Sequence, residues 1–196
     1  MWFYDGSVDL EHTCLSVATN ADAQRFIEVF QADPASEITG TVADAWLAFA
    51  PDEPPPDVAG EPEPGINDIV QIGPLGDCTA AIEPGGWTGI EHQVAGELSR
   101  SGRYAAVFNS LNGPEIFVYA ADGTVVRRFE VGAYDGIDEV GEPLPEEADL
   151  PLGEPAECFA AALLLIERLT GARIEKEWLT EGRRAAFRHR DPTSGG

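Results

Sequence analysis

Residues 104–131 read YAAVFNSLNGPEIFVYAADGTVVRRFEV, and this stretch decides the fold class. It divides into three runs of apolar, β-branched or aromatic residues, 104–111, 115–121 and 124–131. Asn112-Gly113-Pro114 separates the first two runs, and Asp122-Gly123 separates the last two. Asp-Gly between such runs is the strongest short hairpin signal, because both central turn residues adopt positive φ. The stretch therefore predicts an antiparallel meander of three strands.

Patterns on either side of this meander extend the predicted sheet and add helices. Further strands are expected at residues 9–17, 69–72 and 78–83. Helices are expected where apolar residues recur at helical spacing or strong helix formers cluster, at residues 23–30, 41–50, 90–99, 156–170 and 175–181. We therefore expect an α+β fold, with a mainly antiparallel β-sheet of about five or six strands and helices packed on one face.

Length and composition indicate one domain. The chain has 196 residues, near the roughly 150 residues of a typical domain, and enough hydrophobic residues for a core. Two acidic, Pro-rich segments, 51–65 and 142–157, are expected to be surface loops, because proline does not suit a strand ladder. The Arg-rich residues 183–196 are expected to be a flexible tail that folds back onto the acidic body; binding to nucleic acid is the alternative. Residues 1–182 then form a single α+β domain.

The charge of the chain restricts its partners. It has 35 Asp and Glu against 12 Lys and Arg, which gives a formal net charge of −23. This charge argues against a protein that coats nucleic acid or an anionic membrane, because both are bound through clustered basic residues. Dense carboxylates instead attract basic partners at long range. The expected partner is a neutral or basic protein.

Cysteine usage and the N-terminal sequence predict a cytoplasmic protein. Cys14, Cys78 and Cys158 are odd in number, far apart and without a C-x-x-C, so neither a disulfide framework nor a zinc knuckle is indicated. The N-terminus lacks the basic and apolar regions of an export signal. No window reaches the roughly 18 apolar residues of a membrane span. We therefore expect a reducing compartment and no membrane partner.

No sequence motif predicts a catalytic, metal or cofactor site. A P-loop requires a lysine after its glycines, but the one lysine is Lys176, near the C-terminus. His12, His92 and His189 share no helical metal-ligand spacing, and no G-x-G-x-x-G follows a strand. The acids are so numerous that a solvated face is a simpler interpretation than acid–base catalysis. We therefore expect no catalytic residue, no metal and no cofactor.

Four residues are candidate binding residues: Trp87, Glu83, Asn109 and Tyr119. Trp87 follows the tight turn that begins at Glu83, where an aromatic ring can anchor a partner; packing in the core is the alternative. Asn109 and Tyr119 lie on neighbouring predicted strands, where a polar tip on the sheet face can orient a ligand. The alternative is that they are ordinary strand residues with one end in water.

Part of the chain resembles a known family. The likeness is carried by the strand from Cys78, the E-P-x-G-W turn at 83–87 and the hairpin around Asp122-Gly123. These segments resemble an actinobacterial, Streptomyces-type family of domains of unknown function, well over residues 78–131 and loosely over residues 10–180. The long Pro-rich loop and the Arg-rich tail depart from the pattern. The resemblance implies an α+β fold and names no activity, substrate or catalytic residue.

The negative charge, and the absence of residues at the spacing of a catalytic motif, favour a non-enzymatic protein-interaction module of the immunity or defence-accessory type. Such a module binds through its acidic surface. A small-molecule-binding or sensor domain, with a pocket between the sheet and the helices, is the alternative. A third hypothesis is a DNA mimic, which requires ordered carboxylates at phosphate-like spacing.

Overall fold

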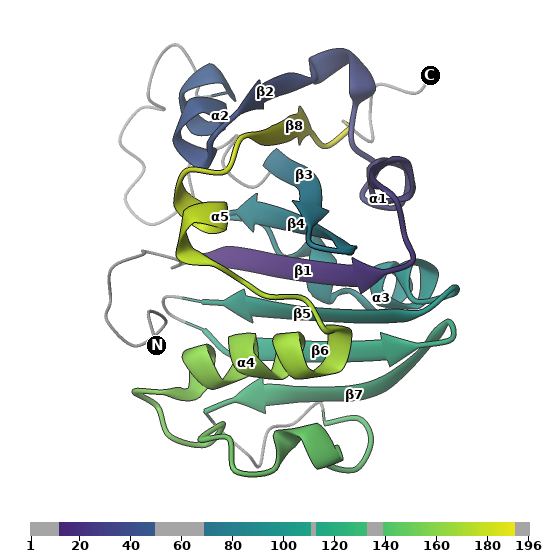
Figure 1. The fold of residues 1–196 in the computed structure, drawn as a ribbon, viewed down its shortest axis with the longest axis vertical. Coiled ribbons are helices and arrows are strands. Elements are labelled where there is room, and N and C mark those ends of the chain that lie inside the picture. The colour runs from purple at the N-terminus through teal and green to yellow at the C-terminus, as the bar shows by residue number, and fades with distance from the viewer. Residues whose placement is uncertain (1–11, 50–68, 111–112, 133–138, 191–196) are drawn as a thin grey trace.

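The computed structural model describes residues 12–49, 69–110, 113–132 and 139–190. These residues form one eight-stranded antiparallel sheet in the order β2-β8-β3-β4-β1-β5-β6-β7 (Figure 1). Its strands are β1 (Thr13–Thr19), β2 (Ile38–Gly40), β3 (Ile69–Leu75), β4 (Cys78–Pro84), β5 (Arg103–Asn109), β6 (Glu115–Ala121), β7 (Thr124–Val131) and β8 (Arg184–Arg188).

The predicted meander β5-β6-β7 is confirmed. Asp122 and Gly123 have φ of 51° and 82°, as a two-residue hairpin turn of this kind requires. Arg103 pairs with Ala121, and Ala121 pairs with Thr124 on the next strand. The local turn chemistry therefore sets the register of this half of the sheet.

Capping residues define one end of two of the described helices. They are α1 (Ala23–Val29), α2 (Val42–Phe49), α3 (His92–Leu98), α4 (Cys158–Thr170) and α5 (Lys176–Thr180), with short 3-10 helices η2 (Pro34–Ser36), η3 (Thr88–Ile90) and η4 (Pro145–Glu147). The Asp22 side chain caps α1 by accepting the N–H of Arg25. Gly171 ends α4 in the left-handed conformation, with φ of 76°.

Helices cover both faces of the sheet, so the prediction of helices on one face is wrong. Leu15 and Val17 of β1 pack in the cluster that contains α4, whereas Cys14 and Ala18 pack with α1 and α3 on the opposite face. A central strand buried on both sides has no polar alternation to indicate a solvated face. We call these two sides the α4 face and the α1–α3 face.

The sheet has eight strands instead of five or six, because β2 and β8 were not predicted. β8 lies in the segment expected as a flexible tail, and it pairs with β2 on one side and β3 on the other. Its residue Arg184 is buried, and its guanidinium lies 4.3 Å from the ring centre of Trp178. Burial lowers the pKa of Arg184 to about 10. Because one of its arginines is buried in the protein, β8 has the Arg-rich composition of a flexible tail although it is a strand of the sheet.

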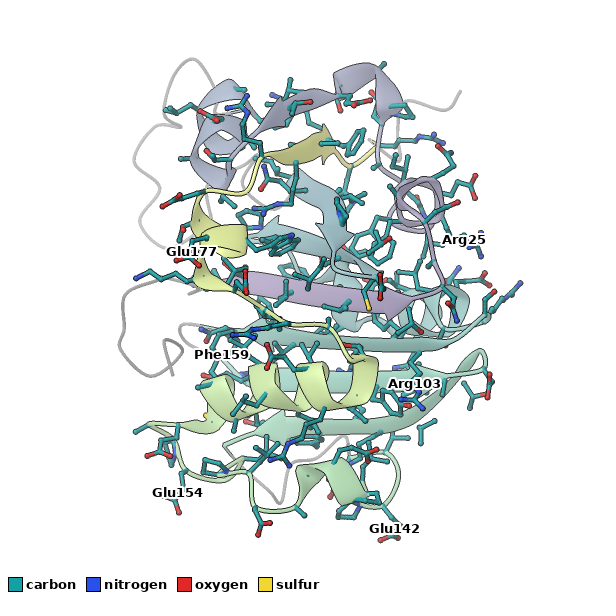
Figure 2. All side chains as sticks on the ribbon, viewed as in Figure 1. Arg25, Arg103, Glu142, Glu154, Phe159 and Glu177 are labelled. Atoms are coloured by element: carbon teal, nitrogen blue, oxygen red, sulfur yellow. The ribbon has the colours of Figure 1, made fainter. Side chains whose placement is uncertain are left out.

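The two acidic segments differ in what the structure describes. Segment 51–65 lies outside the described residues, whereas segment 142–157 contains η4 and connects β7 to α4. In Figure 2 the labelled Glu142, Glu154 and Glu177 lie at the periphery and point outward. No helix in the described ranges has the length and apolar character needed to cross a membrane.

Candidate functional site

The turn after β4 buries a carboxylate. Glu83 is completely inaccessible to solvent, and its two oxygens accept the backbone N–H groups of Thr88 (3.1 Å) and Gly89 (2.8 Å). These amides belong to the first turn of η3, where backbone donors have no partner within the helix. Glu83 therefore holds η3 against the end of β4.

Glycine is required at two positions of this turn. A Cβ atom at Gly89 would lie 2.9 Å from Cys14 Sγ, and still closer to Ser16 Oγ. Gly85 has φ of 76°, a left-handed conformation that favours glycine. The E-P-G-G-W-T-G sequence at 83–89 thus has glycine where space and backbone conformation demand it.

A buried hydrogen-bond chain lies beneath Gly89. The Tyr104 hydroxyl is 2.6 Å from Gly89 O and 2.9 Å from Ser16 Oγ. Since a carbonyl can only accept, Tyr104 donates its proton to Gly89 O and accepts from the Ser16 hydroxyl. Burial raises the pKa of Tyr104 and of Cys14 well above their usual values, and Glu83 also contributes to the rise at Cys14. Both groups stay protonated near neutral pH and are poor nucleophiles.

His189 reaches the same carboxylate from the end of β8. Its Nδ1 is 2.7 Å from Phe30 O, so Nδ1 carries a proton that it donates to this carbonyl. Its Nε2 is 3.6 Å from Glu83 Oε1. A backbone bridge between Ala32 and His189 fixes the histidine beside α1. Only 16% of the His189 side chain is exposed.

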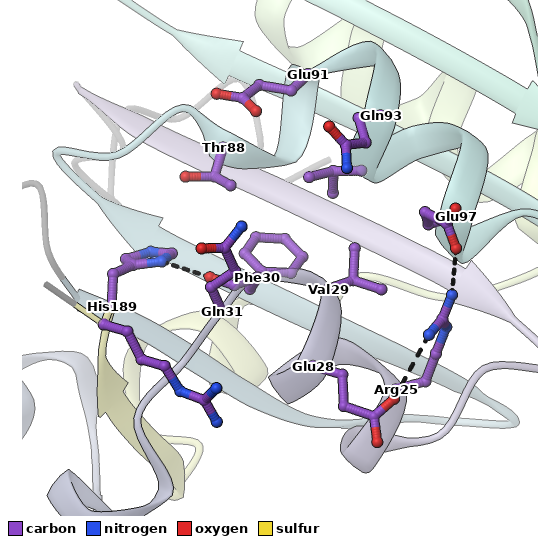
Figure 3. A pocket seen from close by; sticks show the side chains of 12 residues that line it. Arg25, Glu28, Val29, Phe30, Gln31, Thr88, Glu91, Gln93, Glu97 and His189 are labelled. Atoms are coloured by element: carbon purple, nitrogen blue, oxygen red, sulfur yellow. Dashed lines mark hydrogen bonds and ion pairs between the residues drawn. The ribbon is translucent and has the colours of Figure 1, made fainter. Parts of the chain in front are cut away.

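A pocket of about 510 Å³ opens above His189, between α1 and the η3–α3 segment. Figure 3 shows Thr88, Glu91 and Gln93 on one wall and Gln31 and His189 on the facing wall. Arg25 of α1 and Glu97 of α3 form an ion pair across one end. The pocket is therefore a polar cleft with an imidazole on one wall and a buried carboxylate behind that imidazole.

Some of the charges that line the pocket are already paired within the protein. Arg25 binds Glu97 and also Glu28, and Arg100 binds Glu97 from outside the pocket. Among the described residues, no ion pair forms at Glu91 or at Arg190, which line opposite walls. Both side chains are solvent-exposed, and neither has an ion-pair partner within the described ranges, so both are available to a ligand.

The structure brings only part of the predicted set of binding residues together. Glu83 and Trp87 share one turn, and Trp87 is 51% exposed with its ring edge-on to Phe108 at 6.4 Å between centroids. Asn109 is the last residue of β5 and pairs with Thr13. Tyr119 packs on the α4 face, across the sheet from Glu83. A binding role for these four residues stays a prediction.

Sequence reasoning missed His189, Thr88, Ser16 and Tyr104. No local pattern marks His189, because its partners, Phe30 O and Glu83, are far away in the sequence. Only the pairing of β8 in the sheet brings it to Glu83. The glycines of the 83–89 turn are the one local signal, since they mark a close approach of backbone to side chains.

The described residues contain no cluster of three or more potential metal ligands. A family model described as a family of unknown function (DUF6461) matches residues 1–188. No curated protein and no solved structure matches the chain.

Proposed function

The chain belongs to the family of unknown function DUF6461, and from the geometry of its own pocket we propose that it binds a small polar molecule between α1 and α3. The volume of about 510 Å³ lies in the range typical of small-molecule sites. A small-molecule-binding or sensor domain is the alternative function that the sequence suggests, although its pocket is expected between the sheet and the helices and this one lies between α1 and the η3–α3 segment.

The position of His189 in the pocket carries this proposal. To hold η3, Glu83 needs only the two hydrogen bonds that it accepts from backbone amides. His189 nevertheless approaches the same carboxylate, and it lines the pocket at the same time. With Nδ1 bound to Phe30 O and Nε2 turned toward Glu83, the imidazole is fixed in orientation, and its ring forms part of the pocket wall.

Binding is better supported than nucleophilic catalysis. The buried thiol of Cys14 and the phenol of Tyr104 have raised pKa values, so neither supplies an anion near neutral pH. Neither residue lines the pocket. The proposal is therefore a binding or sensor domain, in which the fixed ring of His189 shapes the pocket wall.

Thermal unfolding with a panel of small acids, amines, amino acids, sugars and nucleosides tests this proposal. A ligand at about 100 times its Kd stabilises the folded state by about 2.7 kcal/mol, or roughly 5–10 °C in Tm. His189→Gln should reduce that shift. His92→Gln is the matched control, because His92 is exposed and lies outside the pocket lining. A panel without any stabilising compound would refute the proposal.

Trp87 supports a second candidate function, the protein-interaction module. Large aromatic side chains that remain half-exposed on a rigid turn are typical anchors of interfaces. The net charge of −23 favours a basic partner. Pull-down at moderate salt should recover a partner that Trp87→Ala loses and Leu47→Ala, a control at another exposed apolar residue, retains. Recovery of the same proteins by both variants would contradict this candidate. DNA mimicry stays a prediction.

A further inference from the structure

The pocket lining holds two opposite charges, Glu91 and Arg190, that form no ion pair with any residue that the structure describes. Glu91 precedes α3, and its side chain makes no capping hydrogen bond. Arg190 follows β8, and its backbone N–H donates to Gln31 O at 2.8 Å. Arg190 therefore belongs to the α1 wall and Glu91 to the facing η3–α3 wall. No ion pair joins Arg190 and Glu91 in the described part of the chain, so the guanidinium nitrogens lie more than 4.0 Å from the carboxylate oxygens.

The lining charges argue against a simple anion and against a simple cation. The lining has two guanidinium groups, Arg25 and Arg190, and three carboxylates, Glu28, Glu91 and Glu97. A lone anion would meet this excess of negative charge, with Glu83 behind His189 adding to it. A lone cation at Glu91 would leave the exposed guanidinium of Arg190, on the other wall, in contact with water alone. A molecule with one group of each sign matches both walls.

The pocket lining also contains neutral polar groups. Figure 3 places Thr88 and Gln93 beside Glu91, with Gln31 on the facing wall. Amides and a hydroxyl can donate or accept, so they suit the polar middle of a small molecule. The Arg25–Glu97 pair closes one end and does not compete for the ligand.

From this arrangement we propose that the pocket recognises a small zwitterion, an amino acid or a close analogue, with its carboxylate at Arg190 and its ammonium group at Glu91. A guanidinium binds a carboxylate through two parallel hydrogen bonds, and a carboxylate accepts up to three N–H donors from an ammonium group. This inference rests on the proposed function and specifies the ligand class of the same site.

Isothermal titration and thermal unfolding with a matched compound series test the inference. The series contains the common amino acids, β-alanine and γ-aminobutyrate, with the methyl ester and the N-acetyl derivative of each. The ester lacks the carboxylate, and the N-acetyl derivative lacks the ammonium group. At least one parent compound should bind, and each derivative should bind about tenfold or more weakly, because one charge-assisted contact is lost.

Two charge-neutralising variants assign the ends of the ligand. Arg190→Gln should remove the preference for the parent over its ester, and Glu91→Gln should remove the preference over the N-acetyl derivative. Arg173→Gln and Glu175→Gln are matched controls, because both residues are exposed and pair with each other away from the pocket. Both preferences should persist in these controls.

The outcomes separate this inference from the proposed function. If simple anions, simple amines or the blocked derivatives bind as tightly as the parent zwitterions, the inference of a zwitterionic ligand is refuted and the pocket remains a binding site. If no compound of this series or of the wider panel binds, both proposals fail. The compound series needs no variant, so a variant that folds poorly does not affect this test.

Discussion

The two faces of the sheet each contain a buried glutamate, and the two carboxylates are held in different ways. On the α4 face, Glu147 accepts from Arg127 Nε at 2.9 Å, and Glu139 and Gly141 O bind the same guanidinium. On the α1–α3 face, Glu83 accepts two backbone amides and faces His189. Glu147 is therefore paired with a permanent cation, whereas Glu83 is linked through the imidazole of His189 to a pocket.

This difference shows which buried charge is structural and which is available for function. Burial alone would lower the pKa of Arg127, but its hydrogen bonds to Glu147 and Glu139 raise that pKa. The guanidinium therefore stays charged under all physiological conditions and ties β7 to η4. Glu83, in contrast, lies next to His189, a residue that lines the pocket, so this carboxylate can influence a bound ligand through the imidazole.

Arg127→Met should produce the largest loss of stability, about 3–5 kcal/mol, because it leaves Glu147 buried without its cation. Chemical denaturation measures this loss. Arg173→Met is the control at an arginine whose side chain is 85% exposed, and it should cost no more than about 0.5 kcal/mol. A loss below about 1 kcal/mol in Arg127→Met would show that the Arg127–Glu147 pair is not the clamp described above.

Glu83→Gln should cost about 1.5–3 kcal/mol, because one amide N–H of η3 would then face an NH₂ group instead of an oxygen. It should also weaken ligand binding, since His189 loses the carboxylate behind it. Glu147→Gln is the comparison on the other face: it should destabilise the protein and leave ligand affinity unchanged. Equal effects of the two variants on affinity would remove the functional distinction between the faces.

Gly89→Ala should cost about 1–3 kcal/mol, because the new methyl group overlaps Ser16 Oγ and crowds Cys14 Sγ. In a double-mutant cycle, Ser16→Ala removes the hydroxyl that the methyl group overlaps. The combined loss should therefore fall below the sum of the single losses by about 0.5 kcal/mol or more. Additive losses would mean that the two residues do not compete for this space.

Local signals in the sequence predicted much of the fold. The Asp122-Gly123 turn, the Asp22 cap and the Gly171 helix end each act within a few residues, so their chemistry is readable from the chain itself. The strand β8 was not readable, because Arg184 and Arg188 gave it the composition of a surface tail. Burial of both faces was missed because the sequence patterns on β1 do not reveal which elements will cover it.

The candidate site was predictable only in part. Glu83 and the glycines that follow it form a local pattern, and Glu83 was among the predicted residues. Its partner His189 is placed by the pairing of β8 with β3 and by the bridge to Ala32. Such long-range placement depends on the completed sheet, so no spacing rule in the sequence identifies it.

The smallest expected effect concerns Glu115, a half-buried carboxylate on the α4 face. In the described part of the chain its polar partner is the Cys158 thiol, at 3.4 Å, and not a cation. Burial raises the pKa of Glu115 above its usual 4.5, and the hydrogen bond from Cys158 offsets this only in part. The folded state thus favours the neutral acid, a contribution that is present below pH 4.5 and is lost as the pH rises through the raised value.

Glu115→Gln should therefore match the wild type in acid and become more stable than it near neutral pH, by about 0.5 kcal/mol. Denaturation measured below and above pH 4.5 checks this crossover. The opposite sign, a variant that loses stability as the pH rises, would mean that the ionised Glu115 is stabilised by a partner. Glu115 would then resemble Glu147 and Glu83, and burial alone would no longer separate it from the two glutamates that the protein holds in place.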